Sequence, residues 1–280
     1  MITSVSEERL LVVSDTHLGN PLFNARRGFT EFLRYAWSNS WNVCINGDGV
    51  DIVQTTIPRI TRDLSECSSQ LRHFSEHGLR VYYTVGNHDI VLENFLDDWD
   101  IVCVVPFLNV KSGDRRIRIE HGHLYDESFV NYPFIYHCAT ILGGVALKIH
   151  PRAYKMYSGV KPFFEGVGRF FKSSGPIDEE FADGERIKNE PYCFGPHAEE
   201  ISQHGFDTVI FGHTHLEGEA RLKSGAQYVN TGSWLFEPHY AEIDHGRVSL
   251  KRVSDLVLDE TSGSRSVEKV GARSLAHAAD

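Results

Sequence analysis

The sequence lacks the cysteine spacing, the long apolar run and the excess of positive charge that mark several large classes of protein. Its five cysteines are scattered and never form C-x-x-C, which indicates reduced thiols rather than a disulfide framework or a structural zinc site. The longest apolar stretch, residues 138–149, is shorter than the roughly 20 residues of a membrane-spanning helix. Residues 1–10 contain no apolar signal-peptide core. We expect a cytoplasmic protein, with peripheral contact at the inner membrane surface as an alternative.

The charge balance is acidic, with 28 lysine and arginine residues against 38 aspartate and glutamate residues. A general nucleic-acid binder needs a basic surface, so we expect no stable nucleic-acid partner. The 280 residues and the 41% hydrophobic content fit one large α/β domain that carries an insertion. The sequence indicates no oligomeric state.

Four segments repeat one pattern, in which a short apolar strand ends in polar side chains. These predicted strands cover residues 10–13, 42–45, 79–85 and 208–211, and a fifth covers residues 115–120. Apolar residues at helical spacing over residues 29–37 and 57–74 predict helices between the strands, and this alternation is typical of a layered α/β architecture. Because ligands bind beyond the carboxyl ends of the strands in such sheets, we expect the polar motifs to converge at one edge.

The remaining chain divides into an insertion, two hairpins and a tail. Residues 219–229 and 240–253 predict β-hairpins. Residues 125–196 are rich in aromatic and cationic side chains, and we interpret them as a helical cap inserted into a core made of residues 1–124 and 197–256. Residues 257–280 lack periodicity and predict a flexible tail. The cap would either accommodate a lipid or pack on the core or in a dimer interface.

Five motifs, each placed after a predicted strand, carry the candidate metal ligands. They are Asp15-x-His17, Gly47-Asp48-x-x-Asp51, Gly86-Asn87-His88-Asp89, His121-Gly122-His123 and Gly212-His213-x-His215. Carboxylate, amide and imidazole ligands suit manganese, iron, zinc, cobalt or magnesium and not a thiolate-binding metal. Each motif alone is a weak signal, whereas their joint occurrence in this order is a strong one.

This ordered set resembles the calcineurin-like metallophosphoesterase superfamily over about residues 10–250, apart from the insertion. The resemblance implies a four-layer α/β/β/α sandwich of two mixed sheets, and two divalent metal ions, with manganese as the first expectation. One metal would be held by Asp15, His17, Asp48 and His215, and the other by Asp48, Asn87, His121 and His213. It also implies hydrolysis of a phosphodiester, pyrophosphate or phosphomonoester bond by attack of a metal-bridging hydroxide.

The resemblance further implies that His88 protonates or stabilises the leaving oxygen, a role that suits the titration range of histidine. Asp51 and Asp89 are expected to accept hydrogen bonds that orient histidine side chains. For His123 two roles stay open, orientation of a ligand and contact with the substrate. A histidine at position 88 that merely packs against Asp51 or Asp89 is the structural alternative.

The substrate is less well indicated than the chemistry. The segment Asn230-Thr231-Gly232-Ser233-Trp234 and the position of the insertion resemble the branch that contains the UDP-2,3-diacylglucosamine pyrophosphohydrolases. That likeness implies a phosphorylated small molecule or a nucleotide-linked lipid as the substrate. A cyclic-nucleotide or small-nucleotide phosphodiesterase is the alternative, and a non-catalytic metal-binding scaffold is an alternative of another class.

Overall fold

The structure is a computed structural model that describes residues 3–21, 23, 25–131 and 187–256. Most of the predicted cap, residues 125–196, and the whole of the predicted tail, residues 257–280, lie outside the described residues. Within the described part of the chain, no helix combines the length and the apolar composition needed to cross a membrane.

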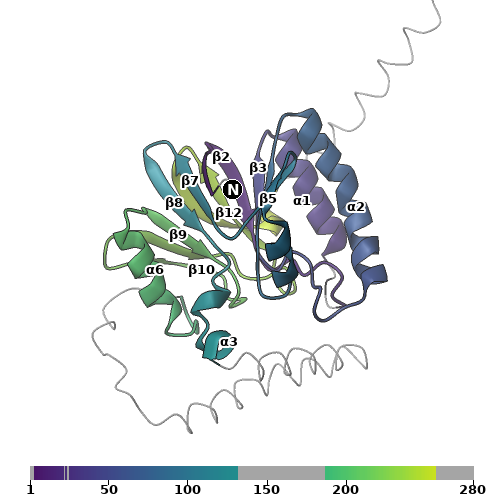
Figure 1. Cartoon of the computed structure of the whole chain (residues 1–280). Helices are drawn as coiled ribbons and strands as arrows, with labels where there is room; N and C mark the ends of the chain where they lie inside the picture. Colours follow the sequence, from purple (N-terminus) through teal and green to yellow (C-terminus); the bar gives the residue numbers. More distant parts are fainter. Residues whose placement is uncertain (1–2, 22, 24, 132–186, 257–280) are drawn as a thin grey trace, which may run out of the picture.

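Two mixed sheets form the centre of the molecule (Figure 1). The first has the strand order β13-β12-β2-β3-β4-β6-β5 and contains β2 (Arg9–Val13), β3 (Asn42–Asn46), β4 (Val81–Thr84), β5 (Asp97–Trp99), β6 (Val102–Val105), β12 (His239–Asp244) and β13 (Arg247–Arg252). The second has the order β1-β7-β8-β9-β11-β10 and contains β1 (Ser4–Ser6), β7 (Leu108–Ser112), β8 (Arg115–Ile119), β9 (Thr208–Phe211), β10 (Gly218–Arg221) and β11 (Gln227–Asn230).

The described helices lie on the outer faces of the two sheets or at their ends. They are α1 (Arg26–Ser38), α2 (Ile57–Glu76), α3 (Glu127–Asn131) and α6 (Phe194–Gln203), with 3-10 turns η1 (Ile90–Phe95), η2 (His123–Tyr125) and η4 (Val253–Asp255). Helices α1 and α2 pack on the seven-stranded sheet, and α6 packs on the six-stranded sheet (Figure 1). This four-layer α/β/β/α arrangement confirms the predicted fold class.

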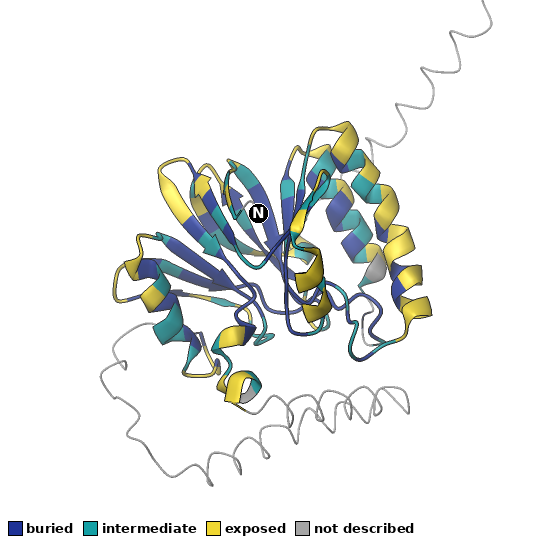
Figure 2. Cartoon of the chain, viewed as in Figure 1, coloured by how far each residue is buried: buried dark blue, intermediate teal, exposed yellow. Residues whose placement is uncertain are grey.

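Strand β2 shows why the sheets are buried on both faces. Leu10 and Val12 face the core between the two sheets, whereas Leu11 and Val13 face the helices. Successive strand residues point to opposite faces, so a continuous apolar run is what a strand covered on both sides requires. Figure 2 shows the same pattern for the described part of the molecule, with buried strands between helices whose outer faces are exposed.

The predicted strands and hairpins are present, and the two hairpins join different sheets. β10 and β11 pair antiparallel and attach to β9, whereas β12 and β13 pair antiparallel and attach to β2. β2, β3 and β4 are mutually parallel, as are β8 and β9. The strands that precede the five motifs therefore run parallel within each sheet, which lets their carboxyl ends meet.

Candidate metal centre

The predicted ligands lie together, although their loops come from two different sheets. The loops after β2, β3 and β4 belong to the seven-stranded sheet, and those after β8 and β9 to the six-stranded sheet. The amide of Asp15 donates to Gly47 O at 3.1 Å, and that of Gly212 donates to His121 O at 3.1 Å. The amide of His213 crosses between the sheets to Asp15 Oδ2 at 3.0 Å. These hydrogen bonds hold the loops of both sheets at one edge of the sandwich.

Most of the predicted ligands have left-handed backbone conformations. The φ angles are 52°, 47°, 50°, 65° and 61° for Asp15, His17, Asp48, His213 and His215. Such conformations cost of order 1–3 kcal/mol each for residues with a Cβ atom. They persist only where the surroundings enforce them, and they concentrate at functional sites. The backbone of these loops is therefore strained in order to aim side chains.

A first cluster of donor atoms joins Asp15, His17 and His215. His215 Nε2 lies 3.0 Å from Asp15 Oδ1 and 3.2 Å from His17 Nε2, and His17 Nε2 lies 4.0 Å from Asp48 Oδ2. Ligands about 2.1 Å from one cation lie roughly 3 Å apart when they coordinate at right angles, so the spacing fits a shared ion. Among the described residues, no contact with the buried Asp15 Oδ1 has hydrogen-bond geometry, which is rare for such an atom and expected of a metal ligand.

A second cluster joins Asn87, His121 and His213 and shares Asp48 with the first. Asn87 Oδ1 lies 3.2 Å from His121 Nε2 and 2.9 Å from His213 Nδ1. Asp48 Oδ2 lies 3.4 Å from His121 Nε2, so the oxygen that faces His17 also faces this cluster. The structure thus brings all the predicted ligands together in two groups that meet at one carboxylate oxygen.

Both histidines of the second cluster are hydrogen-bonded through the ring nitrogen that faces away from it. His121 Nδ1 lies 2.9 Å from Asn46 O, which leaves Nε2 for a ligand role. His213 Nε2 lies 3.0 Å from Asp126 Oδ2, which leaves Nδ1. Such partners fix the tautomer of a metal-binding histidine. The sequence reasoning missed Asp126, because it follows the H-G-H motif in a segment without a ligand pattern.

His88 lies beside Asp51 at the edge of the first cluster. Its Nδ1 is 3.1 Å from Asp51 Oδ1, so Nε2 is the nitrogen available to a bound molecule. Its ring packs edge-on against His17, with 4.8 Å between centroids. Burial acts to lower the pKa of His88, but the carboxylates of Asp48 and Asp51 outweigh it and raise this pKa to about 9. The donors of His17, Asp48 and His88 also form a compact group, so a ligand role for His88 is the alternative.

The hydrogen bonds of Asp89 in the described structure go to the backbone and to a tyrosine, whereas the sequence predicted that it would orient a histidine side chain. Its Oδ2 accepts hydrogen bonds from the amide of Gly49 at 2.9 Å and from the Tyr83 hydroxyl, and its Oδ1 accepts one from the amide of Gly86 at 2.7 Å. Burial and the nearby Asp48 raise the pKa of Asp89 to about 6. Asp89 therefore ties the loop after β3 to the loop after β4. Sequence reasoning also missed Tyr83, which lies in an ordinary strand.

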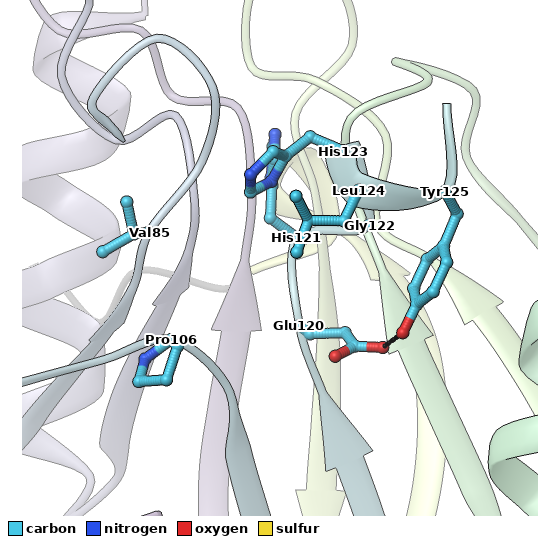
Figure 3. Close-up of a pocket in the computed structure, with 8 residues that line it drawn as sticks. All are labelled: Val85, Pro106, Glu120, His121, Gly122, His123, Leu124 and Tyr125. Carbon is cyan, nitrogen blue, oxygen red and sulfur yellow. Dashed lines mark hydrogen bonds between the residues drawn. The ribbon is translucent and has the colours of Figure 1, made fainter. Parts of the chain in front are cut away.

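His123 borders a small cavity of about 30 Å³ beside the second cluster (Figure 3). The cavity is lined by Val85, Pro106, Glu120, His121, Gly122, His123, Leu124 and Tyr125. His123 is buried, and neither of its ring nitrogens has a hydrogen-bond partner in the described structure. Burial, together with His121 and His213, lowers the pKa of His123 to about 3. Because it makes no hydrogen bond to a ligand, the geometry favours contact with a bound molecule over an orienting role.

The carboxylates of the site and His215 have the protonation states that bind cations, whereas His121 must first lose a proton. Burial acts to raise the pKa of Asp15 and of Asp48, but the surrounding histidines, His121 first, outweigh it and lower both. Burial lowers the pKa of His215. For His121, the carboxylates of Asp48 and Asp15 outweigh burial and raise the pKa to about 10, so an incoming metal must displace a proton there. Ionised carboxylates and neutral imidazoles are the forms that bind divalent metals, and this donor set fits them.

The segment 230–234 forms hydrogen bonds with the backbone of two ligand loops. The amide of Trp234 donates to Asp15 O at 3.2 Å, and Asn230 Nδ2 donates to Gly212 O at 2.9 Å. From the sequence alone, this segment indicated only a resemblance to one branch of the superfamily and no structural role. In the structure it holds the backbone that presents Asp15 and His213.

Gly47→Ala is expected to lower the free energy of unfolding of the metal-free protein by about 2–4 kcal/mol. Gly47 has a φ of 72°, and an added Cβ would lie 2.4 Å from the His121 ring, so backbone strain adds to overpacking. Gly225→Ala is the matched control, since its φ is 84° but nothing lies within 4 Å of the added atom. Urea denaturation measures both. Equal losses in the two variants would show that the contact with His121 does not matter.

The chain matches the family model described as calcineurin-like phosphoesterase over residues 8–217. A curated relative, the UDP-2,3-diacylglucosamine hydrolase of Porphyromonas gingivalis, is 23% identical over 263 residues, covering 89% of this chain and 98% of the relative. Solved structures of similar fold include a dimetal phosphatase from Danio rerio, with 12% identity and a TM-score of 0.47 over 87% of this chain and 95% of that chain. Vacuolar protein sorting 29 of Cryptosporidium parvum has 12% identity and a TM-score of 0.36 over 87% and 95%.

Proposed function

The chain belongs to the calcineurin-like phosphoesterase family, and from this premise we propose that it hydrolyses its phosphoester with two divalent cations. It is a hydrolytic enzyme of a metal-dependent family. The observation that carries the two-cation proposal is the position of Asp48 Oδ2, which lies 4.0 Å from His17 Nε2 and 3.4 Å from His121 Nε2. A carboxylate oxygen in that position can serve two ions at once, and shared anionic ligands are what a pair of cations about 3.5–4 Å apart needs.

The proposed division of ligands follows the two clusters. One cation would be held by Asp15, His17, Asp48 and His215, and the other by Asp48, Asn87, His121 and His213. When bound, such a pair supplies an activated water and Lewis acidity toward the phosphoryl oxygens. We propose manganese as the first metal to test, with iron, zinc, cobalt and magnesium as alternatives.

The protein's own residues would position the substrate and supply the proton for the leaving group. Asp51 holds His88 through Nδ1 at 3.1 Å, which leaves Nε2–H to donate to the leaving oxygen. Asn20 Nδ2 donates to Asp51 Oδ2 at 2.6 Å, so the carboxylate that orients His88 is itself held. A positioned general acid of this kind contributes about 10²–10⁴ in rate.

For the substrate we propose a nucleotide-linked lipid, with a small-nucleotide phosphodiester as the alternative. The proposal is supported by the 23% identical relative, whose name specifies UDP-2,3-diacylglucosamine. It is also supported by apolar side chains near the site: Leu124 borders the His123 cavity and is 63% exposed, and Phe236, 65% exposed, lies 6.2 Å from the His215 ring. Exposed apolar groups beside a metal site suit a substrate with apolar chains.

Hydrolysis of bis-p-nitrophenyl phosphate is expected to require added metal. The protein loaded with Mn²⁺ should hydrolyse it, and chelation should lower the rate at least about 100-fold, because the cations stabilise the transition state by several kcal/mol. Re-adding Mn²⁺ should restore the activity. A non-catalytic scaffold would show no metal-dependent rate.

The same preparation distinguishes the substrate classes. UDP-2,3-diacylglucosamine and a cyclic nucleotide are compared at equal concentration, and the lipid is expected to have the higher kcat/KM. A higher value for the cyclic nucleotide would overturn the lipid proposal and leave the phosphoesterase chemistry intact.

A further inference from the structure

His213 differs from His121 in the kind of group that holds its ring, a side-chain carboxylate for His213 and a backbone carbonyl for His121. Its Nδ1 faces Asn87 Oδ1 at 2.9 Å, and its Nε2 lies 3.0 Å from Asp126 Oδ2. The side chain of His213 is 7% exposed and that of Asp126 is 24% exposed, so water competes little for the bond. Because a carboxylate only accepts, the proton resides on Nε2, and Nδ1 presents its lone pair to the second cluster.

Without Asp126 the ring would be oriented only by the backbone and by its packing against His121, His123 and Phe194. His213 has a φ of 65°, which limits the rotamers of its side chain but does not by itself select one orientation of the ring. The ring of His121 is held instead by a backbone carbonyl, because its Nδ1 is hydrogen-bonded to Asn46 O. A carbonyl is fixed by the fold, whereas Asp126 is a side chain whose position depends on its own segment.

Asp126 lies where the chain leaves the core after the H-G-H motif. Its amide donates to His123 O at 3.2 Å, and its carbonyl accepts from the amide of Val130 at 3.0 Å. It therefore connects η2, which follows β8, to the first turn of α3. Through the Nε2 hydrogen bond it also connects α3 to the loop after β9, which comes from a distant part of the chain (Figure 1).

We propose that Asp126 is a positioning residue that holds His213 in the metal-binding orientation, and that it thereby links one cation site to the position of α3. The inference rests on the proposed two-cation function. Linkage is reciprocal, so a cation bound at His213 and Asn87 stabilises α3 in its observed place, and a ligand that displaces α3 weakens that cation site and spares the other.

The test is a titration of the metal-free protein with Mn²⁺ alone. Calorimetry measures the affinity of each ion, and metal analysis measures how many ions are bound. The wild-type protein should bind two ions. Asp126→Ala should weaken one of them about 10–100-fold, as loss of an orienting partner does, and leave the other unchanged. Asp126→Asn keeps an acceptor without the charge and should fall between. Asp114→Ala, in the exposed turn between β7 and β8, is the matched control and should bind as the wild type does.

Urea denaturation of the metal-free variants separates positioning from a merely structural role. The unfolding midpoint of metal-free Asp126→Ala should fall below that of Asp114→Ala by no more than the loss of the one hydrogen bond to His213 explains. Two ions bound at wild-type affinity by Asp126→Ala would overturn the inference while leaving the proposed function standing, and so would equal weakening of both ions together with a lowered midpoint. A wild-type protein that binds fewer than two ions would overturn the proposed function itself, and the inference with it.

Discussion

Asp48→Asn is expected to abolish metal-dependent hydrolysis, with a loss of at least about 1,000-fold in kcat, equivalent to about 4 kcal/mol of transition-state stabilisation. One oxygen of Asp48 faces both donor clusters. Its other oxygen accepts the amide hydrogen of His88 at 2.7 Å. Asparagine has nearly the same shape but no charge, so it cannot neutralise two neighbouring cations. Metal analysis should find fewer than two bound ions, and steady-state kinetics should give the rate loss.

Asp98→Asn is the matched control for charge removal. Asp98 lies on the edge strand β5, away from the ligand loops, and pairs with Arg80. Removal of its charge should leave both metal content and rate unchanged. The prediction would be contradicted if Asp48→Asn kept two ions and more than about a tenth of the wild-type rate. The shared oxygen would then not be essential to either cation.

The strands and the ligand motifs could be predicted because both follow from local chemistry. Residues 10–13 are apolar on both faces of a strand, and the structure buries all of them. The polar residues that follow lie at the carboxyl ends of parallel strands, where side chains from different loops can converge. The ordered motifs therefore predicted that these side chains lie together at one edge of the sandwich. The prediction did not include that residues 115–120 and 208–211 belong to a second sheet.

The supporting contacts could not be predicted, because they depend on packing between distant segments. Tyr83 lies in a strand and gives no sign that its hydroxyl reaches Asp89. Asp126 shows no motif, and only the fold places it 3.0 Å from His213. The left-handed backbone of Asp15 and Asp48 also could not be predicted from the sequence, since non-glycine residues seldom adopt it, although aspartate does so more often than most. Hydrogen bonds between the loops enforce it.

His88→Ala is expected to lower kcat about 10²–10⁴-fold and to leave two metal ions bound. The contact between residue 88 and Asp48 uses the backbone amide, which alanine retains. Asp51 keeps hydrogen bonds from Asn20 Nδ2 at 2.6 Å and from the amide of Gln54 at 2.9 Å, so the removal of the imidazole leaves no buried carboxylate without partners. The change therefore removes a proton donor without dismantling the site.

The dependence on the leaving group decides whether that donor acts as proposed. A leaving alkoxide needs a proton, whereas p-nitrophenolate is stable without one, so the loss should be larger for an alkyl phosphodiester than for bis-p-nitrophenyl phosphate. His73→Ala, at a half-buried histidine of α2 whose ring stacks on Trp37 of α1, should change neither rate. Equal losses on both substrates with two ions bound would assign His88 to substrate positioning. Loss of one ion would make His88 a ligand, as its compact group with His17 and Asp48 allows.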